Sequence, residues 1–411
     1  MSAQVLRVEP IRHNAFLPYG RQVIEDDDIA AVAEAMRGDL LTTGPYVARF
    51  EAALARTVGA RHAIVCANGT AALHMAARAL NLGPGAKVIV PSVTFLATAS
   101  APHMNGAEIV FADVDPETGL MRPEDLLNAI ARAGRADAVF NVHLNGQCGD
   151  LESIAAIARA HGMKIVDDAC HAIGTGYVAQ DGSVSQIGAN AFCDLTVFSF
   201  HPVKAIAMGE GGAVTTNDPE IAKRLVRARN HGMTRDAAEF RNADDAFDET
   251  GAANPWYYEI AEPEFNWRAN DMQCALGLSQ IAKLGRFVTR RRALAAAYDS
   301  ALAPFAPLVR PLARTRPCLP AWHLYVVRID FERAGISRGH FMRLLAERGI
   351  GSQVHYYPVH RQPYYAQRYG ALDLPGANRY YARALSLPLF ASMNIADAER
   401  VVQTIGIILG F

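Results

Sequence analysis

The sequence predicts an α/β protein of two domains. A large domain at residues 1–285 is expected to hold an N-terminal arm and a mainly parallel sheet of seven strands, and residues 286–411 a smaller α+β domain. Three observations lead to this prediction. With 411 residues the chain is too long for one ordinary domain. Between residues 60 and 217, short apolar runs alternate with helical stretches, which is typical of crossover units in a parallel sheet. Beyond residue 285 the pattern becomes that of an α+β domain.

Seven short segments are expected to form the strands of the large sheet. They are rich in Val, Ile and Phe and are bounded by Gly, Pro, Asn or Asp. In chain order they are Ala63–Ala67, Lys87–Pro91, Glu108–Val114, Asp137–His143, Lys164–Asp168, Leu195–Phe200 and Gly212–Thr216. Ligands of such sheets bind beyond the carboxyl ends of the strands, so the residues that follow these segments are the candidates for chemistry.

The remaining pattern is helical or mixed. A helix is expected over Glu25–Arg37, ended by Gly38, and a long helix over Asp271–Leu302. The segment Thr234–Tyr258 is polar and rich in acids, which predicts a long surface loop. The smaller domain is expected to contain strand His323–Ile329, helix Arg338–Arg348, strand Ser352–Tyr357 and helix Asp397–Ile408.

The composition argues against several classes of protein. The formal net charge is −1, so no nucleic-acid partner is expected. No run of 18 apolar residues occurs, and the start of the chain has no apolar stretch, so we expect neither a membrane protein nor an exported one. The six cysteines form no CxxC pair, which argues against a metal site or a disulfide framework. Free thiols are typical of the cytoplasm.

A glycine turn follows the first predicted strand. In the segment Ala67–Leu73, Gly69 lets the backbone approach an anion, and the N–H groups at the start of the next helix, around Thr70, can bind phosphate. Many ordinary joints between a strand and a helix have the same composition, so this turn alone identifies nothing.

Asp168 stands at the end of a predicted buried strand, in the segment Val166–His171. A buried carboxylate needs a partner, and a protonated pyridine nitrogen is one such partner, because the carboxylate keeps the ring charged. The alternative is a simple helix cap.

Lys204 closely follows the strand that contains Ser199 and lies in an apolar stretch. Burial lowers the pKa of a lysine and yields a neutral amine nucleophile, and the hydroxyl of Ser199 can bind phosphate. The glycine cluster Gly209–Gly212 allows a tight turn after the lysine. An exposed loop lysine before an ordinary hairpin is the alternative.

The order of these elements is more specific than any one of them. Phosphate turn, aspartate, serine and lysine follow one another, with 36 residues from Asp168 to Lys204. This order resembles fold-type I pyridoxal-phosphate enzymes, and SFHPVKAIAMGEGGAVTTND resembles the DegT/DnrJ/EryC1/StrS sugar aminotransferase family. The segments LTTGP, NGTAAL, PSVTFLAT, VDDACHA, NHGM, FNWRANDMQCALG and QVHYYPVH match that family in the same order. The resemblance implies a pyridoxal 5′-phosphate-dependent aminotransferase.

The resemblance also implies a role for each site residue. Lys204 binds the cofactor covalently, and Asp168 pairs with its ring nitrogen. His171 lies near its 3-hydroxyl, and Phe95 stacks on its ring. Some relatives are dehydratases with histidine in place of the lysine, so Lys204 favours transamination. The residues implied for the phosphate are Gly69, Thr70, Ser199 and, from the neighbouring subunit, Asn266, which predicts a homodimer with shared active sites.

Three segments, PYGRQ, NPWYYE and HYYPVHRQPYY, resemble the branch of the family that acts in pseudaminic-acid synthesis. This branch implies L-glutamate as amino donor and UDP-2-acetamido-2,6-dideoxy-β-L-arabino-hex-4-ulose, aminated at C4, as acceptor. Related branches, of the GDP-perosamine and UDP-bacillosamine types, share most of these segments. Contacts to the sugar nucleotide are expected from Tyr19, Asp39, Leu40, Leu41, Thr42, Gln353, His355 and Tyr356. The loop between Gly232 and Asn266 is longer than is usual in the family.

Three other functions differ from this one in the residues or reactions that they require. A nicotinamide-dependent sugar oxidoreductase needs GxGxxG after the first strand, and that motif is absent. A non-catalytic regulator that senses sugar nucleotides would not need Lys204 and Asp168. A different pyridoxal-phosphate reaction, such as lysis of an amino acid, would not show a half-reaction with glutamate.

Overall fold

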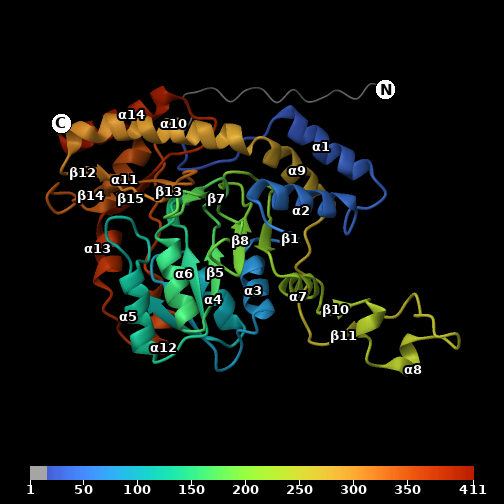
Figure 1. Cartoon of the computed structure of the whole chain (residues 1–411). Coiled ribbons are helices and arrows are strands. Elements are labelled where there is room, and N and C mark those ends of the chain that lie inside the picture. Colours follow the sequence, from blue (N-terminus) through green and yellow to red (C-terminus); the bar gives the residue numbers. More distant parts are fainter. Residues whose placement is uncertain (1–15) are drawn as a thin grey trace, which may run out of the picture.

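The computed structural model describes residues 16–411, and the prediction for the N-terminal arm before Phe16 lies outside the described residues. Its centre is a seven-stranded sheet in the order β1-β9-β8-β5-β4-β2-β3 (Figure 1). Only β9 runs against the others, so the mainly parallel sheet is confirmed. The strands are β1 (His62–Cys66), β2 (Lys87–Pro91), β3 (Glu108–Ala112), β4 (Ala138–Val142), β5 (Lys164–Asp168), β8 (Leu195–Ser199) and β9 (Gly212–Thr216).

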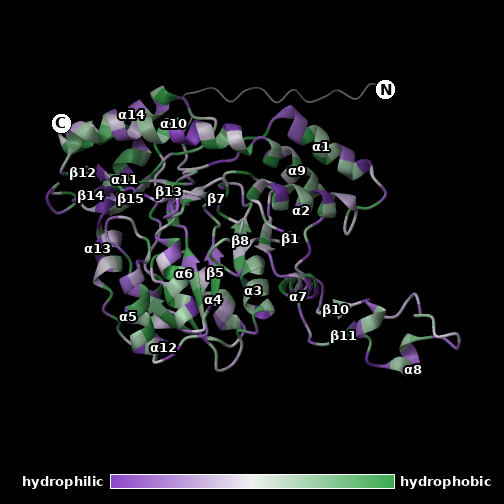
Figure 2. Ribbon diagram, in the orientation of Figure 1, coloured by the Kyte–Doolittle hydropathy of each residue, from purple (hydrophilic) through white to green (hydrophobic). Residues whose placement is uncertain are grey.

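Helices cover both faces of this sheet, and this is why the middle of each strand is apolar (Figure 2). Successive residues of a strand point to opposite faces. Ile64 of β1 therefore packs with α3 (Gly69–Ala79), α4 (Ala97–Met104) and α7 (Pro219–Arg229). Val65, the next residue, packs on the other face with α2 (Pro45–Val58) and α9 (Asp271–Ala282). Farther along that second face lie α5 (Pro123–Ala133) and α6 (Leu151–Ala160).

The smaller domain has its own core around a three-stranded antiparallel sheet. Its strands, in spatial order, are β12 (Val309–Pro311), β14 (Tyr325–Ile329) and β15 (Ala384–Leu387). Its helices are α10 (Leu284–Leu302), α11 (Arg338–Glu347) and α14 (Ile395–Leu409). The helices α12 (Pro363–Tyr369) and α13 (Pro375–Arg383) lie in the same part of the sequence, but Tyr365 and Tyr380 pack into the core of the large domain. Residue 285, the proposed boundary between the domains, lies at the start of α10, and that boundary stays a prediction.

Two predicted elements are wrong. The long helix expected over Asp271–Leu302 is two helices, α9 and α10, with Lys283 between them. The strand expected over Ser352–Tyr357 does not form, because only Gln353 makes a ladder pair, with Ser386. The remaining short elements are α1 (Asp26–Arg37), β6 (Gly176–Val178), β7 (Val184–Gln186), β13 (Cys318–Leu319), η1 (Leu144–Gly146), η3 (Ala303–Phe305) and η4 (Val359–Arg361).

The polar segment after α7 projects away from the body of the molecule, as a surface loop was expected to do (Figure 1). It is not without structure. It contains the strand pair β10 (Met233–Thr234) and β11 (Glu259–Ile260), with η2 (Ala237–Glu239) and α8 (Ala243–Ala246) between them. We call residues 233–265 the excursion. Its base is fixed to α3, because the carboxylate of Glu264 pairs with Arg78 and with His74.

All six cysteines are free thiols. Among residues 16–411, no helix has the length and apolar character needed to cross a bilayer.

Candidate active site

A cavity of about 790 Å³ lies beyond the carboxyl ends of the sheet strands. One wall comes from the residues that end or follow β1, β2, β5 and β8, and the other from Tyr19 and the segment 353–357 of the smaller domain. Most of the predicted site residues meet here. They are Gly69, Thr70, Phe95, Asp168, His171, Ser199 and Lys204, with Tyr19, Gln353, His355 and Tyr356 on the opposite wall.

One end of the cavity is an anion site. Asn68 caps α3 with its side chain, which accepts the N–H of Ala71 at 2.8 Å. Within the described chain, no hydrogen bond occupies the N–H groups of Gly69 and Thr70. A Cβ atom on Gly69 would lie 2.9 Å from the Cβ of Ser199, so only glycine lets this helix start approach the serine. Two free N–H groups at a helix N-terminus and two hydroxyls can together bind a phosphate.

Gly212, which follows the loop that carries Lys204, is also needed for the close packing of the phosphate turn. Gly212 starts β9, where it pairs with Ser199 on one side and with Cys66 on the other. A Cβ atom at this position would lie 2.3 Å from the carbonyl oxygen of Asn68. Any side chain here would therefore push the phosphate turn out of place.

At another part of the cavity, the carboxylate of Asp168 is fixed by two hydrogen bonds. Its Oδ2 accepts the hydroxyl of Thr98 at 2.6 Å, and its Oδ1 accepts the N–H of Cys170 at 3.2 Å. The hydroxyl of Thr94 in turn lies 2.8 Å from that of Thr98. Asp168 is 5% exposed, so this buried, oriented anion suits a cationic partner inside the cavity. The sequence did not point to Thr98.

Lys204 lies in the loop between β8 and β9 and lines the cavity. Desolvation lowers the pKa of its amine, although the thiol of Cys170 and the carboxylate of Asp168 act in the opposite direction. A neutral amine is the form that acts as a nucleophile or a base.

His171 is held as a neutral ring. Its Nδ1 accepts the backbone N–H of Asn145 at 3.2 Å, so its proton belongs on Nε2, which donates to the Tyr356 hydroxyl at 3.1 Å. Burial, with Lys204 and His355 nearby, keeps the pKa of His171 well below its ordinary value. The ring of His323 lies 4.3 Å from that of His171 and also lines the cavity. His323 was not predicted.

Phe95 is 48% exposed, and its ring lies 5.9 Å from that of Tyr356 at the cavity wall. An accessible aromatic face at this point can cover a flat ring. Other lining residues that sequence reasoning missed are Thr94, His201, Glu210, Trp267 and Tyr357.

Two groups of predicted residues lie outside this cavity, and their roles stay predictions. Residues 39–42 are exposed and lie between α1 and α2. The carbonyl of Leu41 accepts the N–H of Asp271, and Thr42 makes a bridge with Asn270. Asn266 is also exposed, and it pairs with Asn230 at the base of the excursion.

The donor set fits pyridoxal 5′-phosphate. The anion site matches the phosphate, the carboxylate of Asp168 matches a protonated ring nitrogen, and Phe95 offers a face to the ring. The amine of Lys204, whose pKa is lowered by burial, matches the aldehyde.

Comparisons with known proteins agree with this geometry. The sequence model of the DegT/DnrJ/EryC1/StrS aminotransferase family matches residues 22–406. The spore coat polysaccharide biosynthesis protein SpsC of Bacillus subtilis (strain 168) is 37% identical over 397 residues, which are 96% of this chain and 97% of that protein.

Two solved structures are similar over nearly the whole chain. The Helicobacter pylori PseC, an aminotransferase involved in the biosynthesis of pseudoaminic acid, has a TM-score of 0.86 and 27% identity over 96% of this chain and 99% of that one. The putative sugar aminotransferase Spr1654 of Streptococcus pneumoniae, in its PLP form, has a TM-score of 0.82 and 26% identity over the same shares. Its PMP form is also similar.

Proposed function

We propose that this chain, which belongs to the DegT/DnrJ/EryC1/StrS aminotransferase family, transfers the amino group of L-glutamate to C4 of UDP-2-acetamido-2,6-dideoxy-β-L-arabino-hex-4-ulose. The chain is a sugar aminotransferase of fold-type I and depends on pyridoxal 5′-phosphate. The proposal adds the donor, the acceptor and the direction of transfer. The corresponding activity is that of a UDP-4-amino-4,6-dideoxy-N-acetyl-β-L-altrosamine transaminase.

The residues of the cavity have different roles in this reaction. When bound, pyridoxal 5′-phosphate supplies an electron sink for the bonds at the carbon that loses or gains the amine. The Asp168 carboxylate holds a positive charge at the ring nitrogen, because Thr98 and Cys170 already orient it. Burial lowers the pKa of the Lys204 amine, which favours its role as the base that takes up a proton from the carbon of the amino donor and returns one to the acceptor carbon. His171, held neutral, would contact the 3-hydroxyl of the cofactor.

The acceptor proposal rests mainly on the similarity to H. pylori PseC over 96% of the chain. The cavity is consistent with it. Tyr19, Tyr356 and Tyr357 line the wall opposite the strand ends, and aromatic faces can stack on a nucleobase or cover a sugar ring. Stereochemical selection needs hydrogen bonds to ring hydroxyls, because a missing partner leaves a buried polar group unpaired.

We also propose a homodimer in which each subunit completes the other's site. Asn266 is exposed and lies outside the cavity of its own chain, as expected of a residue that acts in a neighbouring subunit. It is close in sequence to Trp267, which does line the cavity.

The test is an assay of the purified enzyme with L-glutamate and three keto-sugars: the proposed acceptor, its D-xylo epimer and GDP-4-keto-6-deoxymannose. We expect the highest kcat/KM with the L-arabino sugar. Preference for the GDP sugar would move the protein to the perosamine branch, and preference for the D-xylo epimer to the bacillosamine or legionaminic branch. Either result would overturn the acceptor proposal and leave the aminotransferase assignment intact.

A further inference from the structure

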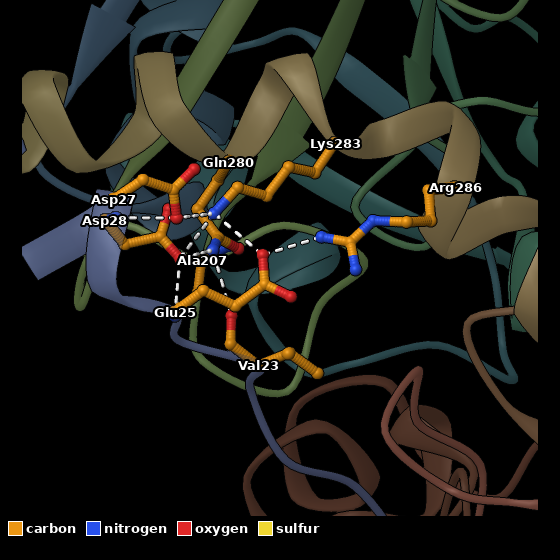
Figure 3. A network of polar contacts seen from close by, with 8 residues as sticks. All are labelled: Val23, Glu25, Asp27, Asp28, Ala207, Gln280, Lys283 and Arg286. Atoms are coloured by element: carbon orange, nitrogen blue, oxygen red, sulfur yellow. Dashed lines mark hydrogen bonds and ion pairs between the residues drawn. The ribbon is translucent and has the colours of Figure 1, made fainter.

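One buried amide connects the lysine loop to the opposite wall of the active site. Gln280 of α9 is 1% exposed and forms three hydrogen bonds (Figure 3). Its Oε1 accepts the backbone N–H of Ala207 at 3.3 Å. Its Nε2 donates to the carbonyl of Val23 at 2.9 Å and to Oδ2 of Asp28 at 2.8 Å.

These partners allow only one orientation of the amide. Ala207 N–H can only donate, whereas the carbonyl of Val23 can only accept. Turning the amide over would place its nitrogen against the N–H and its oxygen against the carbonyl and the carboxylate. The side chain of Gln280 is therefore a fixed spacer between three segments that are distant in sequence.

The first of these segments carries the reactive lysine. The loop closes where Met208 N–H donates to the carbonyl of Phe200 at 2.9 Å. Among the hydrogen bonds of the described chain, the one between Ala207 and Gln280 is the one that ties residues 202–207 to a different element. Ala207 is only three residues from Lys204, so this bond sets how far the loop reaches into the cavity.

Lys204 also stands between two spaces. It lines the large cavity and, behind it, a second cavity of about 10 Å³, which is bordered by Val23, Ala207 and Gln280. A loop released from Gln280 has little room on the side of the small cavity, so the Lys204 amine would move toward the large one.

The second segment is the opposite wall. Tyr19 lines the large cavity, and the chain runs from it to Val23, whose carbonyl Gln280 holds. One side chain therefore fixes both the lysine loop and the wall that faces it.

A second set of contacts, which shares the carboxylate of Asp28 with Gln280, holds α1 against α9 and α10 (Figure 3). The amine of Lys283 lies 3.0 Å from Glu25, 2.5 Å from Asp27 and 3.0 Å from Asp28. Arg286 also pairs with Glu25, at 2.6 Å. Lys283 fills the centre of the three carboxylates, and the ion pairs fasten the helices without touching Ala207.

We propose that Gln280 is a positioning residue that sets the place of the Lys204 amine in the active site. The inference rests on the proposed role of Lys204. A shift of about 1 Å at a reacting group can cost about 100-fold in rate, so a spacer of this kind affects turnover more than substrate binding.

The experiment compares two variants of the full-length, cofactor-loaded enzyme. Gln280→Met keeps the length of the side chain and removes all three hydrogen bonds. Lys283→Met removes the ion pairs between the helices and leaves the Ala207 contact intact, so it is the matched control. Hydrogen–deuterium exchange at the Ala207 amide, resolved by fragmentation, gives a readout that does not depend on activity.

For Gln280→Met we expect at least tenfold faster exchange at Ala207 and a kcat lower by about 10- to 100-fold, with KM for glutamate within about threefold. For Lys283→Met we expect a lower Tm with exchange at Ala207 and kcat close to those of the wild type. If Gln280→Met does not fold, Gln280→Glu replaces it, since one oxygen can still accept from Ala207 while the other faces Asp28. It should lower the Tm and slow turnover less than tenfold.

Two results would overturn the proposal. One is unchanged exchange at Ala207 in Gln280→Met, and the other is an equal loss of kcat in Lys283→Met, which would indicate a general effect of helix packing. Borohydride labelling that misses Lys204 would instead refute the role of Lys204 on which the inference rests, so the two failures are distinguishable.

Discussion

Replacing Asp168 by asparagine tests whether the carboxylate supports the cofactor ring or merely caps a turn. The substitution should fit the structure. The side-chain oxygen can still accept the N–H of Cys170, and the new NH2 group can donate to the hydroxyl oxygen of Thr98, whose own hydrogen can turn toward Thr94. What is lost is the negative charge.

The size of the effect follows from the burial of the site. Asp168 is 5% exposed, so its charge is not replaced by water. Removing one partner of a buried ion pair costs about 3–5 kcal/mol. At about 1.4 kcal/mol for each factor of ten in rate, this corresponds to a loss of about 150- to 5,000-fold. We therefore expect Asp168→Asn to retain bound cofactor and to lose kcat by at least about 100-fold.

The neighbouring residue gives a matched control. Asp167 is also 5% exposed, but its carboxylate faces His143, at 3.2 Å, rather than the cavity. Asp167→Asn should lower the Tm and keep kcat within about threefold, because it removes a buried contact that does not reach the ring. The rate is measured by absorbance in a single-turnover reaction with glutamate, and the Tm of each variant is measured by calorimetry. A kcat for Asp168→Asn close to that of the wild type would show that Asp168 is only a cap.

Three further predictions concern the lysine, the dimer and the response to pH. Borohydride should fix the cofactor to Lys204, as seen by mass spectrometry of the digested protein, and a label on Lys164 would refute the assignment. Mixed dimers of Lys204→Ala and Asn266→Ala subunits should regain one intact site in two, whereas a fully active monomer would exclude shared sites. Burial lowers the pKa of His355 from 6.5 to about 3, so the unfolded chain takes up a proton over this range and the folded chain does not. The free energy of unfolding should therefore fall as the pH drops from 6.5 toward 3, and this fall should be shallower by up to about 1.4 kcal/mol per pH unit in His355→Asn. Equal slopes in denaturant titrations at several pH values would contradict this.

The large sheet could be predicted because its strands are buried on both faces. Such strands are short apolar runs that end at polar residues, and Asp168 and Ser199 were found as those ends. The smaller domain was harder to predict. β15 (Ala384–Leu387) follows α13 with no turn residue between them, so the sequence around Arg383 gives no sign that a helix becomes a strand.

The partners of the site residues could not be predicted for a similar reason. Thr98 lies in the first turn of α4 and is 0% exposed, but nothing local distinguishes it from a threonine that packs in a core. Its function comes from a contact with Asp168, 70 residues away. Gln280 looks like any polar residue on an amphipathic helix until its three partners are seen together.

The base of the excursion, where the chain leaves and returns, makes the geometry of the catalytic cavity independent of the length of the excursion. Met233 pairs with Ile260, so the chain leaves and returns at the same place, and Glu264, whose side chain is 6% exposed, fixes the returning chain to α3. Residues can be gained or lost between β10 and β11 without any change in the path of the main chain that leads to the cavity. The excursion is therefore a natural position for evolutionary insertion, and a practical one for grafting a foreign peptide or an affinity tag.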